Sequence, residues 1–359
     1  MIPALILSKG SPMISRRIAL AALAAALTPT IARSQPGRPQ RLLPPQLKKG
    51  DRMGLIAPSS NAYEPEEIKI AQDTMAQYGF EVVLGKHVND QYGYLAGTDA
   101  DRAADLNAMF ADPRIKGIAT FRGGYGCCRI LPYLDYDLIR ANPKVIIGHS
   151  DITSLLIAIH QKTGLTTFHG PSGLTRVGDY ARTSVQRTIM SDRIPGSIAQ
   201  PDRTSGEIDF DNRLITLAPG TAIGRLIGGN LSLVTNLLGT PYEPDTQGKI
   251  LFLEDVGEEP YRIDRMLTHL LNAGKLQSAA GIAFGHFTDC APKEHLPTFM
   301  QTLSLESVLR DRCRGLKIPV LYNLMFGHLR PNATLPIGCL AKLDATAQTL
   351  TLLESSVVA

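Results

Sequence analysis

Tryptophan is absent from the sequence, and aromatic residues make up only 6% of its 359 residues. This scarcity argues against a stacking platform for single-stranded nucleic acid or for a glycan, since such platforms need several aromatic side chains. Hydrophobic residues make up 44% and charged residues 19%, a composition typical of globular proteins. The composition excludes a disordered, collagen-like or coiled-coil chain, and the length is enough for two domains.

Acidic residues are absent from the first 34 positions, which hold four basic residues, Lys9, Arg16, Arg17 and Arg33. These four equal the formal net charge of +4, so the rest of the chain is close to neutral. A neutral body argues against nucleic acid and anionic membrane surfaces as partners.

Long apolar runs are absent as well. No stretch has the roughly 20 residues of a membrane-spanning helix, so we expect no stable membrane insertion. The run from Ile18 to Leu27 follows an arginine pair and precedes Ala32 and Ser34, which resemble an A-x-A cleavage site. This arrangement is typical of a secretory signal peptide.

The pair Arg16-Arg17 resembles a twin-arginine export signal, although the phenylalanine that usually follows such a pair is missing. We expect residues 1–34 to be the signal peptide and residues 35–46 to be a proline-rich linker. The mature protein is then expected in the periplasm. An amphipathic N-terminal helix or an uncleaved anchor is the alternative.

Signals for metals and cofactors are missing. The five cysteines include no C-x-x-C pair, and the histidines form no H-E-x-x-H motif. The glycines form neither a dinucleotide fingerprint nor a P-loop. We therefore expect no metal and no cofactor, and we expect mostly buried thiols.

Short apolar runs alternate with segments of helical periodicity in the first half of the chain. Strands are expected at 53–57, 81–84, 117–121 and 144–147, and helices at 64–78, 99–111 and 151–162. This alternation predicts a parallel α/β sheet, in which ligands bind beyond the carboxyl ends of the strands. The loops 58–62, 121–128 and 148–151 should therefore meet at one site.

A polar stretch, residues 179–222, separates this region from a second apolar block. We expect a first domain over 47–178, a connecting region over 179–222 and a second domain over 223–359. The second block predicts strands at 249–253, 281–284 and 320–322, a helix at 261–273 and a pair of strands within 340–353.

Two loops of the first domain could carry chemistry. Gly148-His149-Ser150-Asp151 joins a strand to a helix, where a serine hydroxyl is exposed and helix N–H groups can bind an oxyanion. The G-x-S-x-G pattern is incomplete because Ile152 replaces its last glycine. The simpler interpretation is that Ser150 or Asp151 only caps the helix. The loop 122–126 has three glycines and allows three interpretations. Its backbone N–H groups could bind a phosphate or donate to an oxyanion, or the loop could be a plain tight turn.

Two polar segments end apolar runs in the second half. Glu254 directly follows a buried run, where an acid that orients a histidine would lie, whereas the carboxylates after it are expected to be solvated. His328 is a candidate proton shuttle for a serine hydroxyl. His149, His169 and His286 are rivals, and a lone histidine is more often structural.

Taken together, these segments resemble the LD-carboxypeptidase family of serine peptidases, also called muramoyltetrapeptide carboxypeptidases. The matching stretches are 50–60, 93–126, 146–155, 250–267 and 326–338. The resemblance implies an α/β fold. An N-terminal parallel-sheet, flavodoxin-like domain would carry the nucleophile, and a smaller C-terminal α/β domain would carry the acid and the histidine.

Position by position, the resemblance implies a triad of Ser150 as nucleophile, Glu254 as acid and His328 as base. Backbone N–H groups of Asp151 and Gly124 match the family's oxyanion hole. Arg122, beside the glycine loop, is a candidate for binding the terminal carboxylate of a substrate, and its alternative role is a structural salt bridge.

The implied function is hydrolysis of the L,D peptide bond before the terminal D-Ala of murein tetrapeptides, so the expected partner is a murein peptide. The family is often dimeric, which allows a homodimer. Well-known members act in the cytoplasm on recycled muropeptides. An exported chain would differ from them in its location. One alternative is a same-family peptidase for a peptide–nucleotide antibiotic, and another is a non-catalytic, murein-binding periplasmic protein.

Overall fold

The computed structural model describes residues 39–198, 212–293 and 297–359. The chain divides into two units, residues 1–38 and residues 39–359, and the fold below is that of the second unit. The expected signal peptide and the start of the expected linker lie outside the described residues. Among the residues described, no helix combines the length and the apolar character needed to span a membrane.

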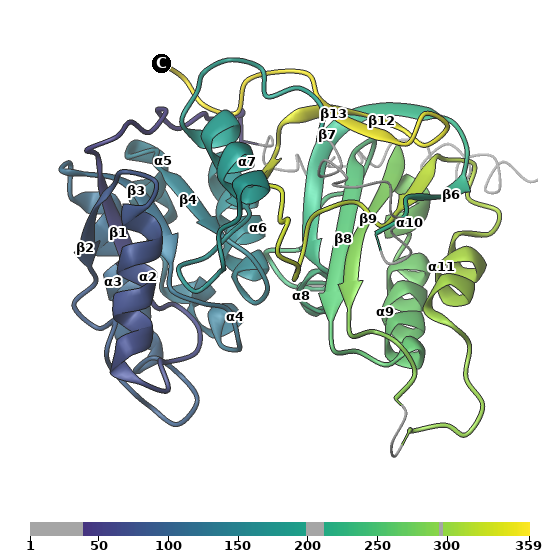
Figure 1. Cartoon of the computed structure of the whole chain (residues 1–359), viewed down its shortest axis with the longest axis horizontal. Coiled ribbons are helices and arrows are strands. Elements are labelled where there is room, and N and C mark those ends of the chain that lie inside the picture. The colour runs from purple at the N-terminus through teal and green to yellow at the C-terminus, as the bar shows by residue number, and fades with distance from the viewer. Residues whose placement is uncertain (1–38, 199–211, 294–296) are drawn as a thin grey trace, which may run out of the picture. The chain divides into compact units, whose positions relative to one another are not determined.

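The first sheet has six strands. They are β1 (Arg52–Ile56), β2 (Glu81–Leu84), β3 (Ile115–Thr120), β4 (Val145–Gly148), β5 (Thr167–His169) and β11 (Leu335–Ile337). Their order is β11-β5-β4-β3-β1-β2 (Figure 1). Strands β1 to β5 are parallel in the flavodoxin-like order 2-1-3-4-5, and β11 is antiparallel to β5. The predicted parallel α/β domain is confirmed.

Helices cover both faces of this sheet. They are α2 (Pro65–Ala76), α3 (Asp99–Ala111), α4 (Cys127–Ile130), α5 (Tyr136–Ala141), α6 (Ile152–Thr163) and α7 (Asp179–Ile189), with a 3-10 turn at Leu131–Tyr133. Helices α2 and α7 share one hydrophobic cluster with Leu55 and Phe168 of the sheet. Helices α3, α5 and α6 belong to a second cluster, which continues into the second sheet.

The second sheet has seven strands. They are β6 (Ile215–Ala218), β7 (Thr221–Asn230), β8 (Ile250–Val256), β9 (Gly281–Thr288), β10 (Val320–Tyr322), β12 (Leu340–Asp344) and β13 (Thr349–Leu352). Their order is β13-β12-β7-β8-β9-β10-β6, with β7 to β10 parallel. The helices of this half are α8 (Leu231–Asn236), α9 (Pro260–Asn272), α10 (Lys275–Ser278) and α11 (Leu305–Cys313).

Helix α6 lies between the two sheets. Nine of its twelve residues are buried, and it contacts β4 and β5 of the first sheet and β7 of the second. A helix that is apolar on all sides is typical of a protein interior. Gly164, in the left-handed conformation, ends the helix. Because α6 is held on every side, the turn of residues 148–151 that precedes it is also fixed.

The expected strands and helices are present, with ends that differ by a few residues. The polar stretch 179–222 also contains helix α7 and strand β6. Strand β11 comes from the expected second domain but joins the first sheet. Pro45, in the expected linker, pairs with Val358 near the end of the chain. The two halves of the described chain are therefore interlocked.

Candidate active site

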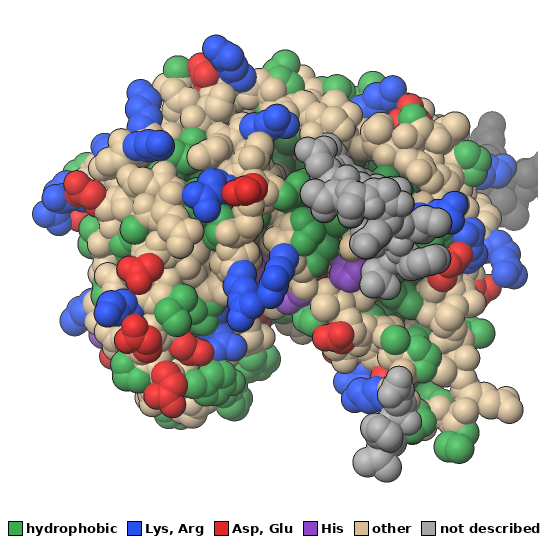
Figure 2. Space-filling view, viewed as in Figure 1, with side chains coloured by type: hydrophobic (Ala, Val, Ile, Leu, Met, Phe, Trp, Pro, Cys, Tyr) green, Lys and Arg blue, Asp and Glu red, His purple; other side chains and the backbone are tan. Residues whose placement is uncertain are grey.

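A pocket of about 460 Å³ opens at the carboxyl ends of the strands of the first sheet. Its walls include residues 122–124, 149–150 and 172–176 of the first half and residues 327–330 of the second half. Figure 2 shows histidine side chains beside Lys and Arg side chains in a hollow on this face. Of the three loops that the sequence predicted to meet at one site, 121–128 and 148–151 line the pocket, whereas no residue of 58–62 does.

Ser150 occupies a sharp turn between β4 and α6. Its φ angle of 64° lies in the left-handed region, which serine rarely adopts. A Cβ atom on Gly123 would lie 2.6 Å from the Ser150 Cβ, and one on Gly148 would collide with the Thr120 hydroxyl. The turn therefore needs these two glycines, because a larger residue at either position would collide with a neighbouring side chain.

Asp151 does not cap helix α6, because its side chain makes no capping hydrogen bond. Its buried carboxylate instead accepts hydrogen bonds from the Ser59 hydroxyl, at 2.6 Å, and from the Cys127 N–H, at 2.8 Å. These partners belong to the loops after β1 and β3. One carboxylate therefore fastens both loops to the Ser150 turn, and the cap reading of Asp151 is wrong.

The glycine loop lies against this turn. Gly124 has a φ of 123°, and a Cβ atom there would collide with the Ser60 hydroxyl, which accepts a hydrogen bond from the Tyr125 N–H at 3.1 Å. Gly123 and Gly124 both line the pocket. The Asp151 N atom lies 3.3 Å from the position of a Gly123 Cβ. Of the two backbone positions expected to form an oxyanion hole, Asp151 directly follows Ser150 and Gly124 lines the same pocket, while Gly123 makes the close approach to Ser150.

His328 and Glu254 form a close pair in the second half of the site. Glu254 lies near the end of β8 and is fully buried, while the side chain of His328 is 17% exposed. The Nδ1–H of His328 donates to Glu254 Oε2 at 2.6 Å. A Cβ atom on Gly327 would lie 2.8 Å from the same oxygen, so glycine is needed there for the pair to approach.

The pair holds opposite charges that stabilise each other. Burial alone would raise the pKa of Glu254, but His328 and His169 outweigh it and hold that pKa well below its usual range. Burial alone would lower the pKa of His328, but the Glu254 carboxylate outweighs it and raises that pKa above 6.5. The imidazole is therefore more basic than an ordinary histidine.

The rival histidines have other surroundings. His149 lies with its ring 5.0 Å from that of His328, and burial, with His328 and His169 nearby, lowers the pKa of His149 to about 3. His169 is fully buried, with Nε2 3.5 Å from Glu254 Oε1. His286 lies 2.9 Å from Asn323 Oδ1. Of these rivals, His169 is a functional neighbour that sequence reasoning did not assign.

The carboxylates after Glu254 are not solvated as expected. Asp255 is buried and accepts hydrogen bonds from the side chains of Asn230 and Ser232 at the start of α8. Burial, with the nearby Glu254 charge, raises the pKa of Asp255 to about 6. Asp255 therefore has a structural role that a run of acidic residues at a strand end does not reveal.

Three arginines line the pocket, and sequence reasoning identified only one. The Arg122 guanidinium lies 3.9 Å from Glu67 and 5.0 Å from the centre of the Tyr63 ring. Arg176 and Arg330 have no ion-pair partner within the part of the chain that the structure describes. Arg330 lies two residues after His328, inside a stretch that carried the family resemblance. This position in the sequence is the signal that could have identified Arg330.

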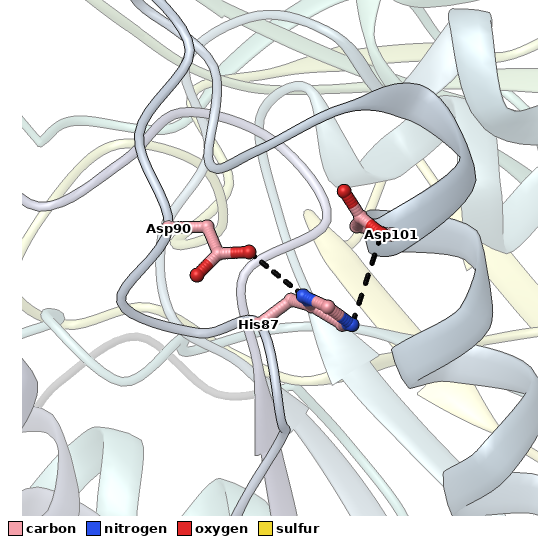
Figure 3. Close-up of side chains that lie close together, drawn as sticks. All are labelled: His87, Asp90 and Asp101. Atoms are coloured by element: carbon pink, nitrogen blue, oxygen red, sulfur yellow. Dashed lines mark hydrogen bonds and ion pairs between the residues drawn. The ribbon is translucent and has the colours of Figure 1, made fainter.

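Among the described residues, one group of side chains that could together hold a metal ion lies outside the pocket (Figure 3). His87 Nδ1 lies 2.7 Å from Asp90 Oδ2, and its Nε2 lies 3.8 Å from Asp101 Oδ1. Both ring nitrogens thus face carboxylates. The hydrogen bond between His87 and Asp90, with Asp101 on the other side of the ring, accounts for the arrangement without a metal ion.

We predict that Gly123→Ala lowers the free energy of unfolding by roughly 1–3 kcal/mol, because the new methyl group collides with Ser150 in a site that cannot relax. Denaturant unfolding measures this change. Gly178→Ala is the matched control, because no atom lies within 4 Å of its added methyl group. Equal effects of the two substitutions would contradict the close approach of the glycine loop to Ser150.

We also predict that His328 titrates above pH 6.5 and that Glu254→Gln brings its pKa below 6.5, because burial then acts without the opposing carboxylate. NMR titration of the ring protons, assigned with a His328→Gln variant, measures both values. His149 should stay neutral throughout the neutral range. An unchanged His328 pKa in Glu254→Gln would show that the pair is not coupled.

Known proteins share this architecture. Two models of the LD-carboxypeptidase family match the chain: the N-terminal domain over residues 53–170 and the C-terminal domain over residues 223–343. A probable murein peptide carboxypeptidase of Bacillus subtilis (strain 168) is 42% identical over 319 residues, which cover 88% of this chain and 95% of the relative. The murein tetrapeptide carboxypeptidase of Pseudomonas aeruginosa is 36% identical over 82% of this chain and 93% of its own length.

Solved structures have the same fold. The structure of MccF in complex with glutamyl sulfamoyl guanosine has a TM-score of 0.78 and 28% identity, and the match covers 88% of this chain and 100% of that one. A muramoyltetrapeptide carboxypeptidase from Oxalobacter formigenes has a TM-score of 0.72 and 26% identity, covering 86% and 100%. With both family domains matched in chain order and relatives above 30% identity along most of its length, the chain belongs to the LD-carboxypeptidase family of peptidases.

Proposed function

We propose that this protein is a serine-type LD-carboxypeptidase that removes the terminal D-Ala of murein tetrapeptides. The observation that carries the proposal is the pocket lined by both Ser150, in its strained turn, and His328, which is paired with the buried Glu254. The names of the relatives, murein peptide and murein tetrapeptide carboxypeptidases, support this choice of substrate. We further propose that the first 34 residues direct the enzyme to the periplasm.

The first step is attack of Ser150 on the carbonyl carbon of the L,D peptide bond. His328 takes the hydroxyl proton as the Oγ–C bond forms, since a serine hydroxyl is too weak an acid to attack unaided. Glu254 holds the imidazole through Nδ1–H and stabilises its positive charge. The backbone N–H groups of Asp151 and Gly124 receive the developing oxyanion.

The second step is collapse of the tetrahedral intermediate. The C–N bond breaks, His328 gives its proton to the leaving nitrogen, and D-Ala departs as a free amino acid. The shortened peptide remains as an ester of Ser150. Water, deprotonated by His328, then attacks this ester and releases a tripeptide and free Ser150.

A carboxypeptidase must also bind the carboxylate of the residue that it removes. Arg122, Arg176 and Arg330 give the pocket wall three positive charges against the single negative charge of Glu67. Such a wall attracts an anionic peptide. We assign the terminal carboxylate to Arg122 because it adjoins the glycine loop beside Ser150.

Two alternatives would use the same site. The first is a peptidase for a peptide–nucleotide compound, favoured by the likeness to MccF, which binds glutamyl sulfamoyl guanosine. No Phe, Tyr or Trp is among the described residues that line the pocket, which gives a nucleobase less support there than a peptide. The second is a murein-binding protein without catalysis, against which the basic His328 argues.

Mass spectrometry of the purified protein with murein tetrapeptide tests the proposal. We expect the wild type to release one D-Ala and Ser150→Ala to release none, because the variant lacks the attacking oxygen. A loss of several thousandfold or more is typical for removal of a nucleophile. Release by both proteins would refute the role of Ser150. Binding without release by the wild type would favour the non-catalytic alternative.

Substrates with and without a terminal charge test the role of Arg122. We expect Arg122→Gln to raise KM for the tetrapeptide and to lower kcat/KM by roughly 10- to 100-fold, the loss expected for a charge-assisted hydrogen bond. The variant should cleave the C-terminal amide of the same peptide as well as the wild type does. Arg140→Gln, an exposed arginine outside the pocket wall, is the control. Equal losses on both substrates would argue against carboxylate binding.

A further inference from the structure

His169 is a fully buried histidine beside the site that the proposed mechanism does not use. It is the last residue of β5. The rings of Phe252 and Phe326 meet its imidazole edge to face, with ring centres 5.6 and 6.5 Å from that of His169. A histidine in such apolar surroundings is costly unless its ring nitrogens have a polar partner, so its place in the fold needs an explanation.

The backbone of His169 is bound to two of the segments that carry the proposed triad. On one side it pairs with Gly148 of β4, the strand that ends at the Ser150 turn. On the other side it pairs with Leu335 of β11, the strand that follows the His328 loop. In a sheet, such pairing fixes the face to which each side chain points. The side chain of His169 is therefore placed by the same strands that place the serine and the histidine of the triad.

That side chain faces the acid of the triad. His169 Nε2 lies 3.5 Å from Glu254 Oε1, while the other oxygen, Oε2, accepts a hydrogen bond from His328 at 2.6 Å. Among the described residues, neither Glu254 Oε1 nor either ring nitrogen of His169 has another hydrogen-bond partner. Buried polar groups without a partner are destabilising. A small movement of either side chain completes a hydrogen bond between the two, which satisfies both groups at once.

We infer that His169 is a positioning residue whose Nε2–H donates to Glu254 Oε1, so that the carboxylate presents Oε2 to His328 in one fixed orientation. The inference rests on the proposed function, because it adds His169 to the proposed triad. The proton must lie on Nε2, since an ionised carboxylate only accepts hydrogen bonds. A carboxylate held at both oxygens cannot rotate away from its partner. The same contact joins the sheet that carries the nucleophile to the strand that carries the acid.

A second donor also changes the electrostatics of the pair. With His169 in place, Glu254 shares its negative charge between two imidazoles. Without His169, the carboxylate acts on His328 alone, which stabilises the imidazolium further and raises the pKa of His328. The other titratable groups of the described chain that face this cluster are His149, Asp255 and Cys290. They are the same in every variant, so a difference between variants reports on His169.

The pH profile of kcat/KM on murein tetrapeptide tests this role, because its acid limb reports the pKa of the base in the free enzyme. We expect His169→Leu to lower the plateau by roughly 10- to 100-fold, the loss expected for a hydrogen bond to a charged group. Its acid limb should move to higher pH. His169→Gln has an amide N–H at about the reach of Nε2, and it should restore the wild-type acid limb and most of the plateau.

His160→Leu is the matched control. His160 lies on α6, where its Nδ1 is 2.9 Å from the Leu165 carbonyl oxygen, and it does not line the pocket. This variant should keep the wild-type plateau and acid limb. A lower plateau with an unmoved acid limb in His169→Leu would show that His169 only fills space, which would overturn the inference. A wild-type profile in His169→Leu, or no restoration by His169→Gln, would overturn it too.

A measurement without turnover decides the matter even if His169→Leu does not fold or the proposed reaction is wrong. Nitrogen-15 NMR of the histidine rings in the Ser150→Ala protein reports which nitrogen of each imidazole carries the proton. The His169 signals are assigned through their contacts with the rings of Phe252 and Phe326. We expect a proton on Nε2 of His169 at neutral pH. A proton on Nδ1 alone would overturn the inference, whatever the wild type does to the tetrapeptide.

Discussion

Helix α6 must stay buried between two sheets, and the geometry of the site depends on this constraint. Its side chains belong to the hydrophobic cluster that runs from the first sheet into the second. A rotation or shift of the helix would disturb packing on both sides, so the turn before it has a single available position. The left-handed conformation of Ser150 costs free energy of the order of 1 kcal/mol, and the packing of α6 supplies the stability that maintains it.

Two buried carboxylates, those of Asp151 and Glu254, then align the groups around the Ser150 turn, which helix α6 positions. Asp151 fastens the loops after β1 and β3 to the Ser150 turn through hydrogen bonds from neutral donors. Glu254 is paired with His328 on one oxygen and faces His169 with the other. In the same strand, burial and the Glu254 charge raise the pKa of Asp255 even though Asn230 and Ser232 donate hydrogen bonds to it. Glu254 differs from Asp255 because two histidines lie against its carboxylate.

Much of the fold could be predicted from the sequence because apolar periodicity is strong where strands are buried, as in Val145–Gly148 and Ile250–Val256. Strand Leu335–Ile337 could not, because Pro336 argues against a strand unless an edge position is known. From the residues alone, the Ser150 turn could be a helix cap, the glycine loop a tight turn and His328 a structural histidine. Only the family resemblance singled out Ser150, Glu254 and His328. The sequence named His169 only as a rival to His328 and did not single out Arg176, since the relevance of both arises from contacts between segments distant in sequence.

The antiparallel strand β11 also has a consequence for the order of events during synthesis. Strand β5 ends at His169, and its partner, Leu335–Ile337, leaves the ribosome about 170 residues later. At 5–20 residues per second, the edge of the first sheet remains uncovered for roughly 10 to 30 s. During that interval the first half of the chain has an open strand edge and an apolar helix α6 that lacks its contacts with β7, α8 and β11. The nascent chain is therefore a natural client for chaperones, and the two halves reach their final state together rather than one after the other.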